Sequence, residues 1–207
     1  LARHVGYSNI GTFEFLVRVS ESNEAGSFAF IETNARLQVE HTVTEVVTGV
    51  DVVQTQIQLA QGESLSDIGL DSQETINPRG FAIQTRVNME TLSPSGNLRP
   101  SSGMLISYDP PTGPGVRTDG FGYSGYTTNS LFDSLLAKVI SYSSSPQFER
   151  AVGKSLSSLS EFRIEGVDTN IGFLKNVLNH PDFMDGSVHT RWVDENLKTL
   201  AVVDELD

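Results

Sequence analysis

The sequence predicts an α+β protein, and three features of its pattern support this fold class. Residues 11–19 and 27–34 alternate apolar and polar side chains on either side of a polar segment, as in a β-hairpin. Further strand-like segments occur between residues 80 and 128, separated by Gly, Pro and Ser. Two amphipathic helical patterns follow, at residues 147–162 and 170–180. Strands that precede helices, instead of alternating with them, favour an α+β fold.

The first third of the chain predicts a hairpin, a helix and a connector. The segment "SESNEAG", residues 20–26, is a polar turn between the two strands of the hairpin. Residues 50–62 carry apolar side chains at helical spacing, and Gly62 is expected to end that helix. Residues 63–78 are rich in polar and turn-forming residues, and we expect them to connect two domains.

The remainder predicts antiparallel strands first and two helices after them. Residues 81–89, 103–109 and 115–120 have strand-like patterns. Residues 133–143 are mostly apolar and fit either a buried strand or a short helix, because periodicity does not distinguish the two. Residues 196–207 end in several acidic side chains and are expected to form a linker or tail.

The composition is that of a folded protein, and it excludes several classes. The 207 residues, 38% of them hydrophobic, are enough to build a core in one large domain or two small ones. Cysteine is absent, which excludes disulfides and thiolate metal sites. No apolar run approaches the ~20 residues that a membrane span requires. The net charge of −12 argues against general affinity for nucleic acid or anionic membranes.

The segment "FIETNARLQVEH", residues 30–41, places polar side chains at every second position. In an extended chain these side chains share one face, and mostly apolar residues occupy the other. The polar residues are Glu32, Asn34, Arg36, Gln38 and Glu40. Two carboxylates, a guanidinium and two amides on one face predict a site for charged ligands.

A metal site is predicted where the two strands of the hairpin meet. A symmetric turn centred on Asn23 would place Glu14 directly opposite Glu32, with Cβ atoms roughly 5 Å apart. Because the other face is apolar, we expect this end to be half buried, and two buried carboxylates require a proton or a cation. Such oxygen ligands suit Mg²⁺ or Mn²⁺ shared with a nucleotide phosphate, and Asn34 adds a carbonyl oxygen. The alternative is a solvated polar face on which the pair is accidental.

Arg36 and Glu40 extend the polar row and suggest an anion site. An arginine on a rigid strand can hold a small planar oxyanion through two hydrogen bonds. A neighbouring carboxylate could then remove a proton from that anion as a general base. The alternative is a surface salt bridge.

The residues "FIETNARLQVEHTVTEVVTGVDVV" resemble the signature of the biotin carboxylase component of biotin-dependent carboxylases, a branch of the ATP-grasp ligases. The resemblance also includes "GTFEFL", "GFAIQTRVN", "RPSSG", "GPGVRTDG", "FDSLLAKVI", "FRIEGVDTNIGFL" and "HPDF", and so covers nearly the whole chain. It implies that residues 1–62 end an ATP-grasp domain. Residues 79–195 would form the biotin carboxylase C-terminal domain.

The resemblance implies an ATP-dependent carbon–nitrogen ligase. Such enzymes activate bicarbonate as carboxyphosphate and then transfer the carboxyl group to biotin on a carrier domain. Glu14 and Glu32 would hold the Mg²⁺ or Mn²⁺ ions that bridge the ATP phosphates, with Asn34 assisting. Metal charge at that position would relieve phosphate repulsion.

The same resemblance implies roles for residues that contact bicarbonate and biotin. Arg36, Gln38 and the backbone near Val39 would bind bicarbonate, and Glu40 would deprotonate it. Arg117, in "GPGVRTDG", would stabilise the negative charge that develops on the ureido oxygen of biotin. Arg36, Glu40 and Arg117 are therefore the expected catalytic residues.

The chain departs from the family pattern by substitution and by absence. Phe81, Gln84 and Val46 replace residues that are frequent in the family, and none has a proposed role in the site. The glycine-rich lid over ATP, the nucleotide-binding lysines and the N-terminal domain precede this segment in the family. The chain begins "LARHVGYSNIGTFEF", without an initiator Met or a signal-peptide pattern, and we expect it to be the middle of a longer protein. Alone, it is expected to be inactive.

Other chemically suggestive residues are expected to be structural. The four histidines, His4, His41, His180 and His189, lack metal-ligand spacing. Lys138 is expected to be solvated, Trp192 to pack in the core, and Asp133 to organise a turn.

Two alternatives remain: a non-catalytic module for dimerisation and carrier docking, or a segment of another ATP-grasp ligase such as carbamoyl-phosphate synthase. The motifs are more similar to pyruvate carboxylase and single-chain acyl-CoA carboxylases than to the free-standing bacterial subunit. Expected cofactors are ATP, Mg²⁺ or Mn²⁺, and biotin. Expected partners are bicarbonate, the biotin carrier domain, the carboxyltransferase domain, the rest of the ATP-grasp domain and a second copy in a homo-oligomer. The expected compartment is the cytoplasm or, in a eukaryote, the mitochondrion.

Overall fold

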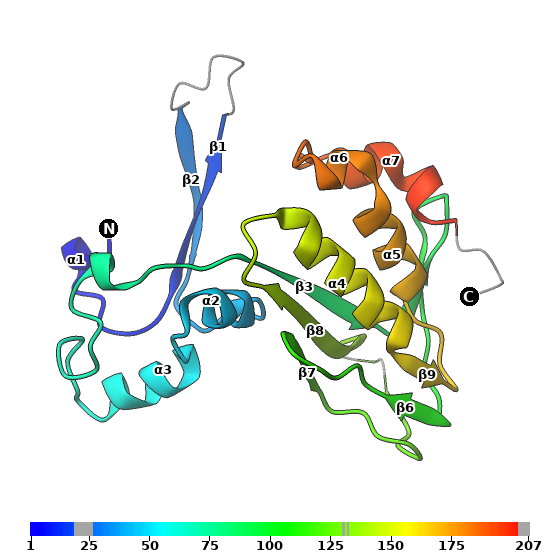
Figure 1. The fold of residues 1–207 in the computed structure, drawn as a ribbon, viewed down its shortest axis with the longest axis horizontal. Helices are drawn as coiled ribbons and strands as arrows, with labels where there is room; N and C mark the ends of the chain where they lie inside the picture. Colours follow the sequence, from blue (N-terminus) through cyan, green and yellow to red (C-terminus); the bar gives the residue numbers. More distant parts are fainter. Residues whose placement is uncertain (19–26, 130, 132, 203–207) are drawn as a thin grey trace. The chain divides into compact units, whose positions relative to one another are not determined.

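The chain forms two compact units in a computed structural model, which describes residues 1–18, 27–129, 131 and 133–202 (Figure 1). The units are Leu1–Pro78 and Arg79–Asp207. No helix in the described part of the chain is long and apolar enough to cross a membrane.

The N-terminal unit consists of a two-stranded hairpin and short helices. Its elements are α1 (Ala2–Val5), β1 (Thr12–Val17), β2 (Phe28–Asn34), α2 (His41–Thr48), α3 (Val52–Ala60) and the 3-10 helix η1 (Gln73–Thr75). Strands β1 and β2 pair antiparallel, which confirms the predicted hairpin. The polar turn predicted at residues 20–26 lies outside the described residues.

Helix α3 confirms the helix predicted within residues 50–62. Asp51 caps its first turn, because one carboxylate oxygen accepts a hydrogen bond of 2.7 Å from the amide of Gln54. The extended chain expected over residues 30–41 ends earlier, since β2 stops at Asn34 and helix α2 begins at His41. The chain turns before α2 through backbone bonds from His41 to Gln38 and from Val43 to Glu40. Three valines at positions 43, 46 and 47 give α2 an apolar stripe that the alternating pattern before it obscured.

The C-terminal unit combines antiparallel strands with helices, which confirms the predicted α+β class. Its strands are β3 (Phe81–Asn88), β4 (Glu90–Leu92), β5 (Leu98–Pro100), β6 (Ser107–Asp109), β7 (Val116–Gly120), β8 (Leu135–Ser143) and β9 (Arg163–Glu165). Its helices are α4 (Phe148–Glu161), α5 (Ile171–Asn179), α6 (Pro181–Met184) and α7 (Trp192–Leu200).

The central sheet of this unit has the order β3-β8-β7, and all its pairs are antiparallel. The apolar run at residues 133–143 thus forms a buried strand and not a helix. Gly80, just before β3, has a φ of 64°, and a Cβ atom there would overlap the carbonyl oxygen of Ser143. Two smaller antiparallel pairs, β4-β5 and β6-β9, flank the sheet.

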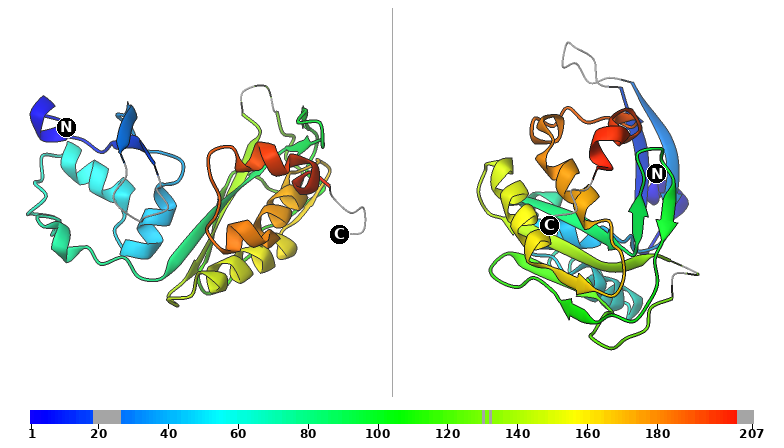
Figure 2. Two further views of the ribbon diagram at one scale, coloured as in Figure 1. Left: turned by 90° about the horizontal axis from the view of Figure 1, so that it is seen from above. Right: turned by 90° about the vertical axis from the view of Figure 1, so that its right-hand side faces the viewer.

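Helix α4 covers one face of the sheet (Figures 1 and 2). The core there joins Val87 and Val139 from the strands to Val152 and Leu159 from the helix. Small side chains such as Ser155, which is fully buried, let the helix lie close to the strands. The helices predicted at 147–162 and 170–180 are confirmed as α4 and α5.

The prediction of a linker or tail at residues 196–207 is wrong for residues 196–200, which are helical. Helix α7 runs to Leu200, whose side chain is 1% exposed. The indole of Trp192 donates a hydrogen bond of 2.9 Å to Asp182 of α6 and is almost fully buried, which confirms its predicted packing role. The described residues after β8 thus contain four helices, not two, with β9 between α4 and α5, and the acidic end of the sequence concealed the last helix. Residues 203–207 are outside the described part.

Candidate active site

Glu14 of β1 and Glu32 of β2 are direct partners in the hairpin ladder. Paired residues of antiparallel strands point to the same face, so the predicted register and the shared face are both confirmed. The register shifts between Glu14 and Phe15, so that Phe15 pairs with Phe30. Because of this bulge, the pairing predicted from a symmetric turn holds only in the half of the hairpin that is farther from the turn, at residues 12–14.

Two side-chain amides hold the carboxylates, and one of them connects the pair. The Asn34 side-chain nitrogen donates to Oε1 of Glu14 at 2.9 Å and to Oε1 of Glu32 at 2.8 Å. The Gln38 side-chain nitrogen donates to the same Glu14 oxygen at 2.7 Å. The two carboxylate oxygens therefore converge on a single positively polarised donor. Two carboxylates that converge in this way supply the oxygen ligands that suit a hard cation such as Mg²⁺ or Mn²⁺.

Burial is not what holds this pair together in the described chain. The sequence predicted a half-buried end, but Glu32 is exposed, and Phe15 and Ile31 are 41% and 50% exposed. Glu14, Phe13 and Asn34 are half buried. Hydrogen bonds from the amides therefore offset part of the repulsion between the carboxylates, and exposure to solvent screens it further. Among the described residues, no cluster of three or more His, Cys, Asp or Glu side chains forms a metal site by itself.

The polar row does not continue on the strand past Asn34, which corrects the extended interpretation. Arg36, Gln38 and Glu40 lie in the segment between β2 and α2. Arg36 donates to the backbone carbonyl of Leu37 at 3.2 Å, and Glu40 occupies the position just before the first turn of α2. Their positions thus depend on this turn and not on strand alternation.

A cavity of about 400 Å³ nevertheless brings these three side chains together. Its lining includes Arg36, Gln38 and Glu40, with the start of β1 and the first turns of α2 and α3 as the remaining walls. Gly11 lies in the wall, and a Cβ atom there would sit 3.0 Å from the carbonyl oxygen of Asn34. The close approach of the two segments therefore requires glycine or a local shift. A cation, an amide and a carboxylate around a small cavity fit a planar oxyanion with an acidic proton.

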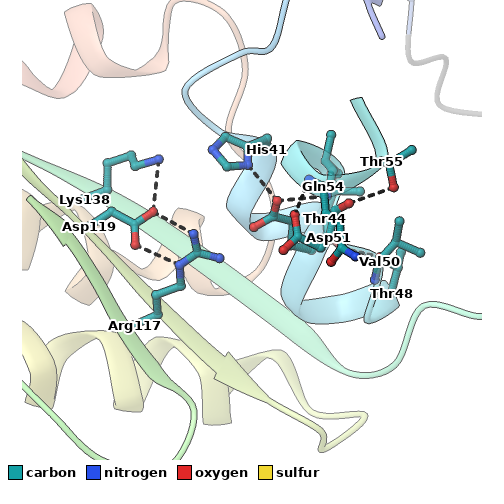
Figure 3. A network of polar contacts seen from close by, with 12 residues as sticks. His41, Thr44, Thr48, Val50, Asp51, Gln54, Thr55, Arg117, Asp119 and Lys138 are labelled. Atoms are coloured by element: carbon teal, nitrogen blue, oxygen red, sulfur yellow. Dashed lines mark hydrogen bonds and ion pairs between the residues drawn. The ribbon is translucent and has the colours of Figure 1, made fainter. Parts of the chain in front are cut away.

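The helix behind this cavity is held by a buried pair that sequence reasoning missed (Figure 3). The ring of His41 hydrogen-bonds Oε1 of Glu45 at 3.0 Å, and that oxygen also accepts from the backbone amide of Val52 at 3.0 Å. Glu45 is 8% exposed and so links the start of α2 to the first turn of α3. The signal was present as a His and a Glu four residues apart, but it has meaning only once α2 is recognised.

In the C-terminal unit, Arg117 lies on β7 and makes a two-point ion pair with Asp119. The distances are 2.8 Å from Nε to Oδ1 and 2.9 Å from Nη2 to Oδ2. Lys138 of β8 approaches the same carboxylate at 3.5 Å (Figure 3). The Lys138 side chain is only 12% exposed, so the expectation of a solvated lysine is wrong. Asp119 and Lys138 were not proposed as site residues, although residues 117 and 119 share a face of any strand.

The residues expected to be structural behave mostly as such. Asp133 accepts a hydrogen bond of 2.9 Å from the amide of Leu135, which confirms its turn role. His180 stacks edge-on against Trp192, and His189 lies 3.5 Å from Glu195. Both contacts are local.

Family comparisons agree with this geometry. A family model described as the biotin carboxylase C-terminal domain matches residues 84–195. A second, described as the carbamoyl-phosphate synthase L chain ATP-binding domain, matches residues 1–68. The first match covers more than half of the chain. The chain therefore belongs to the biotin carboxylase family.

Curated relatives include pyruvate carboxylase 1 of Caenorhabditis elegans, 49% identical over 197 residues, and human mitochondrial pyruvate carboxylase, 45% identical over 197 residues. Each match covers 95% of this chain and 16% of the relative. The chain thus spans about a sixth of the length of these enzymes.

Solved structures show the same likeness. A single-chain, multi-domain long-chain acyl-CoA carboxylase superimposes with a TM-score of 0.88 at 42% identity, covering 100% of this chain and 22% of that one. The biotin carboxylase domain of Hydrogenobacter thermophilus 2-oxoglutarate carboxylase gives 0.85 at 38% identity, covering 98% and 42%. That structure is described as a domain dimer in complex with MgADP, ADP and bicarbonate.

Proposed function

We propose that this chain is the C-terminal part of an ATP-dependent biotin carboxylase, which activates bicarbonate and carboxylates biotin on a carrier domain. The observation that carries the proposal is the Glu14–Glu32 pair, held by Asn34 and Gln38 beside a cavity that Arg36 and Glu40 also line. The MgADP and bicarbonate in the Hydrogenobacter thermophilus domain support it. Because the chain spans about a sixth of its relatives, the proposal includes that it is inactive alone.

Glu14 and Glu32 would hold a divalent cation through their carboxylates, with the amide oxygen of Asn34 assisting. Bound there, Mg²⁺ or Mn²⁺ supplies positive charge against the phosphates of ATP. The chain's own contribution is orientation, because Gln38 fixes the Glu14 carboxylate through the bond of 2.7 Å. That amide also lines the cavity, so one side chain connects the metal ligands to the proposed bicarbonate site.

In the cavity, Arg36 and Gln38 would bind bicarbonate together with the backbone near Val39. Glu40 would accept the bicarbonate proton as general base. The resulting dianion would attack the γ-phosphate of ATP, the bond between the γ-phosphorus and the oxygen bridging to the β-phosphate would break, and carboxyphosphate and ADP would form. Arg117 would act on biotin, where its guanidinium stabilises the negative charge that develops on the ureido oxygen.

The proposal extends to domains, partners and compartment. Residues 1–62 would end the ATP-grasp domain, 63–78 would connect, and 79–195 with helix α7 would form the C-terminal domain. The partners would be a biotin carrier domain, a carboxyltransferase domain, the rest of the ATP-grasp domain and a second copy of the chain. The compartment would be the cytoplasm, or the mitochondrion in a eukaryote, as in the human relative's name.

A comparison of Glu40→Gln with Arg117→Gln tests the proposal in a complete biotin carboxylase that carries this chain. Glu40→Gln keeps shape but cannot take a proton, so bicarbonate-dependent ATP hydrolysis should fall by about 10²–10⁴ with or without biotin. Arg117→Gln should suppress biotin carboxylation by about 10²–10³ and largely retain the slow, biotin-independent ATPase.

Phosphate release with and without free biotin, alongside carboxybiotin formation, separates the two roles. If both variants lose the biotin-independent ATPase equally, Arg117 belongs to the bicarbonate or phosphate chemistry instead. If Glu40→Gln retains this ATPase, the assignment of the base is wrong.

A further inference from the structure

The face of the central sheet that carries Arg117 is opposite to the face that α4 covers. Val87 and Val139 pack against α4, and residues in the alternate positions of β3, β8 and β7 point away from it. In the ladder, Asp119 is the direct partner of Lys138, and Arg117 lies two residues before Asp119. These three charged side chains therefore project from one face as a compact group (Figure 3).

The hydrogen bonds between Arg117 and Asp119 fix the orientation of the guanidinium as well as its position. Two bonds, at 2.8 and 2.9 Å, join two nitrogens of the guanidinium to two different oxygens of the carboxylate. A fork of this kind sets the plane of the guanidinium as well as its position. It engages Nε and Nη2, so the edge that carries Nη1 is turned away from the carboxylate.

Asp119 is itself held from a neighbouring strand. Nζ of Lys138 lies 3.5 Å from Oδ2 of Asp119, and the lysine side chain is largely buried. Partial burial raises the pKa of the Asp119 carboxyl, but hydrogen bonds and charge from Arg117 and Lys138 outweigh it and hold the pKa below its ordinary value. Arg117 and Lys138 thus favour the charged form of the carboxylate.

A second pair in the same unit provides a contrast. Arg163 and Glu165 of β9 are also two residues apart, with bonds of 2.9 and 2.8 Å, but both bonds go to a single carboxylate oxygen. The side chains of this pair are 64% and 44% exposed, against 42% and 31% for Arg117 and Asp119. The Arg163–Glu165 pair therefore lacks hydrogen bonds to both carboxylate oxygens, and it is more exposed than the Arg117–Asp119 pair.

We propose that Asp119 is a positioning residue, which, supported by Lys138, orients the Arg117 guanidinium toward the group whose charge it stabilises. The inference rests on the proposed role of Arg117 in biotin carboxylation and adds the residues that preorganise it. A donor that is fixed before the reaction needs no reorganisation as charge develops. Loss of the Asp119 carboxylate should therefore slow the carboxylation of biotin without removing the Arg117 donor.

The test uses Asp119→Asn in a complete biotin carboxylase, with Glu165→Gln as the matched control. Asp119→Asn should lower carboxybiotin formation by up to about 10²-fold. Biotin-independent, bicarbonate-dependent ATPase should stay within about twofold of the wild-type rate. Glu165→Gln should change neither. In an Arg117→Gln background, Asp119→Asn should cause no further loss, because a positioning residue acts only through the group it positions.

Lys138→Met provides a second variant, in which the fork remains but its support is weakened. It should lower carboxybiotin formation in the same direction and by a smaller factor than Asp119→Asn. A fold-related loss would instead lower the biotin-independent ATPase in parallel, and that result would overturn the inference. An Asp119→Asn effect of equal size in the Arg117→Gln background would also overturn it.

The outcome also separates this inference from the proposed function. If Arg117→Gln is impaired and both Asp119→Asn and Lys138→Met carboxylate biotin normally, only the positioning role is wrong. If Arg117→Gln itself carboxylates biotin at the wild-type rate, the proposed role of Arg117 is wrong and the positioning role falls with it.

Discussion

The two units of this chain place polar chemistry on different kinds of scaffold. In the C-terminal unit, Arg117 projects from a sheet whose other face packs on α4 around Val139 and Leu159. Every buried apolar residue found in the described chain belongs to this unit. In the N-terminal unit, the buried side chains among the described residues are Thr42 and Glu45, which are both polar.

This difference separates the sources of order in the two candidate regions. Arg117 is oriented on a sheet that apolar burial stabilises, whereas the Glu14–Glu32 pair is ordered by a hairpin ladder and by amide hydrogen bonds. Phe15 of the hairpin contacts both Phe28 and Phe30 edge to face, yet all three rings stay exposed. Mutations should therefore affect stability mainly in the C-terminal unit and ligand binding mainly in the N-terminal one.

Truncation of one leucine in each unit, a buried one in the C-terminal unit and an exposed one in the hairpin, should show the largest contrast. Leu159→Ala removes a side chain that is 1% exposed and should lower the free energy of unfolding of the 207-residue chain by about 2–5 kcal/mol. Leu16→Ala removes one that is 52% exposed and should change it by about 0.5 kcal/mol or less. Urea unfolding followed by far-ultraviolet circular dichroism reports on both units, and the fluorescence of Trp192, the single tryptophan, reports on the C-terminal one.

Comparison of Leu16→Ala with Leu159→Ala tests this contrast between the two units. If Leu16→Ala lowers the free energy of unfolding measured by circular dichroism as much as Leu159→Ala does, the exposed hairpin contributes to stability as much as the core, and the proposed division is wrong.

A smaller contrast concerns two aspartates whose pKa values lie below the ordinary 3.8 for different reasons. Hydrogen bonds from Ser64, side chain first and then backbone, lower the pKa of Asp67 in the N-terminal unit. In Asp119, burial opposes the shift, and Arg117 and Lys138 produce it from the same sheet. A carboxyl with a depressed pKa contributes stability above its unfolded pKa and loses it as the pH falls through its folded value.

Both contributions should therefore disappear on acidification below about pH 4. In an NMR titration of the chain, Ser64→Ala should raise the pKa of Asp67 only, and Arg117→Gln should raise that of Asp119 only. Movement of both by one substitution would contradict the assignment of separate, local causes.

Much of the fold was predictable where one periodicity dominates. The hairpin, α3, α4 and α5 each follow a single repeat, and the pairing of Glu14 with Glu32 followed from counting residues across the turn. The segment after Asn34 was not predictable in this way, because "NARLQVEH" continues a period of two while its backbone turns into α2. The sequence continues to alternate polar and apolar residues after the strand has ended, and only the backbone hydrogen bonds of residues 38–43 show where the chain turns.

The site was predictable in its residue types and less so in its supports. The sequence motifs identified Glu14, Glu32 and Arg117 as site residues. The groups that hold Arg117 in place come together only through the pairing of strands in the fold. Lys138 reaches Asp119 only because β8 lies between β3 and β7, and no spacing along the chain contains that information. The apolar run around Lys138 also fits a helix, which would have directed the lysine elsewhere.

The most direct test of the central claim is the Mg²⁺ requirement of Glu32→Gln in a complete biotin carboxylase that carries this chain. Removing one carboxylate of the pair should raise the Mg²⁺ concentration for half-maximal bicarbonate-dependent ATPase by about tenfold or more. Glu74→Gln, at an exposed glutamate of η1 in the same unit, should leave it unchanged. An unchanged Mg²⁺ requirement in Glu32→Gln would contradict the account, because the paired carboxylates of the hairpin would then not hold the metal.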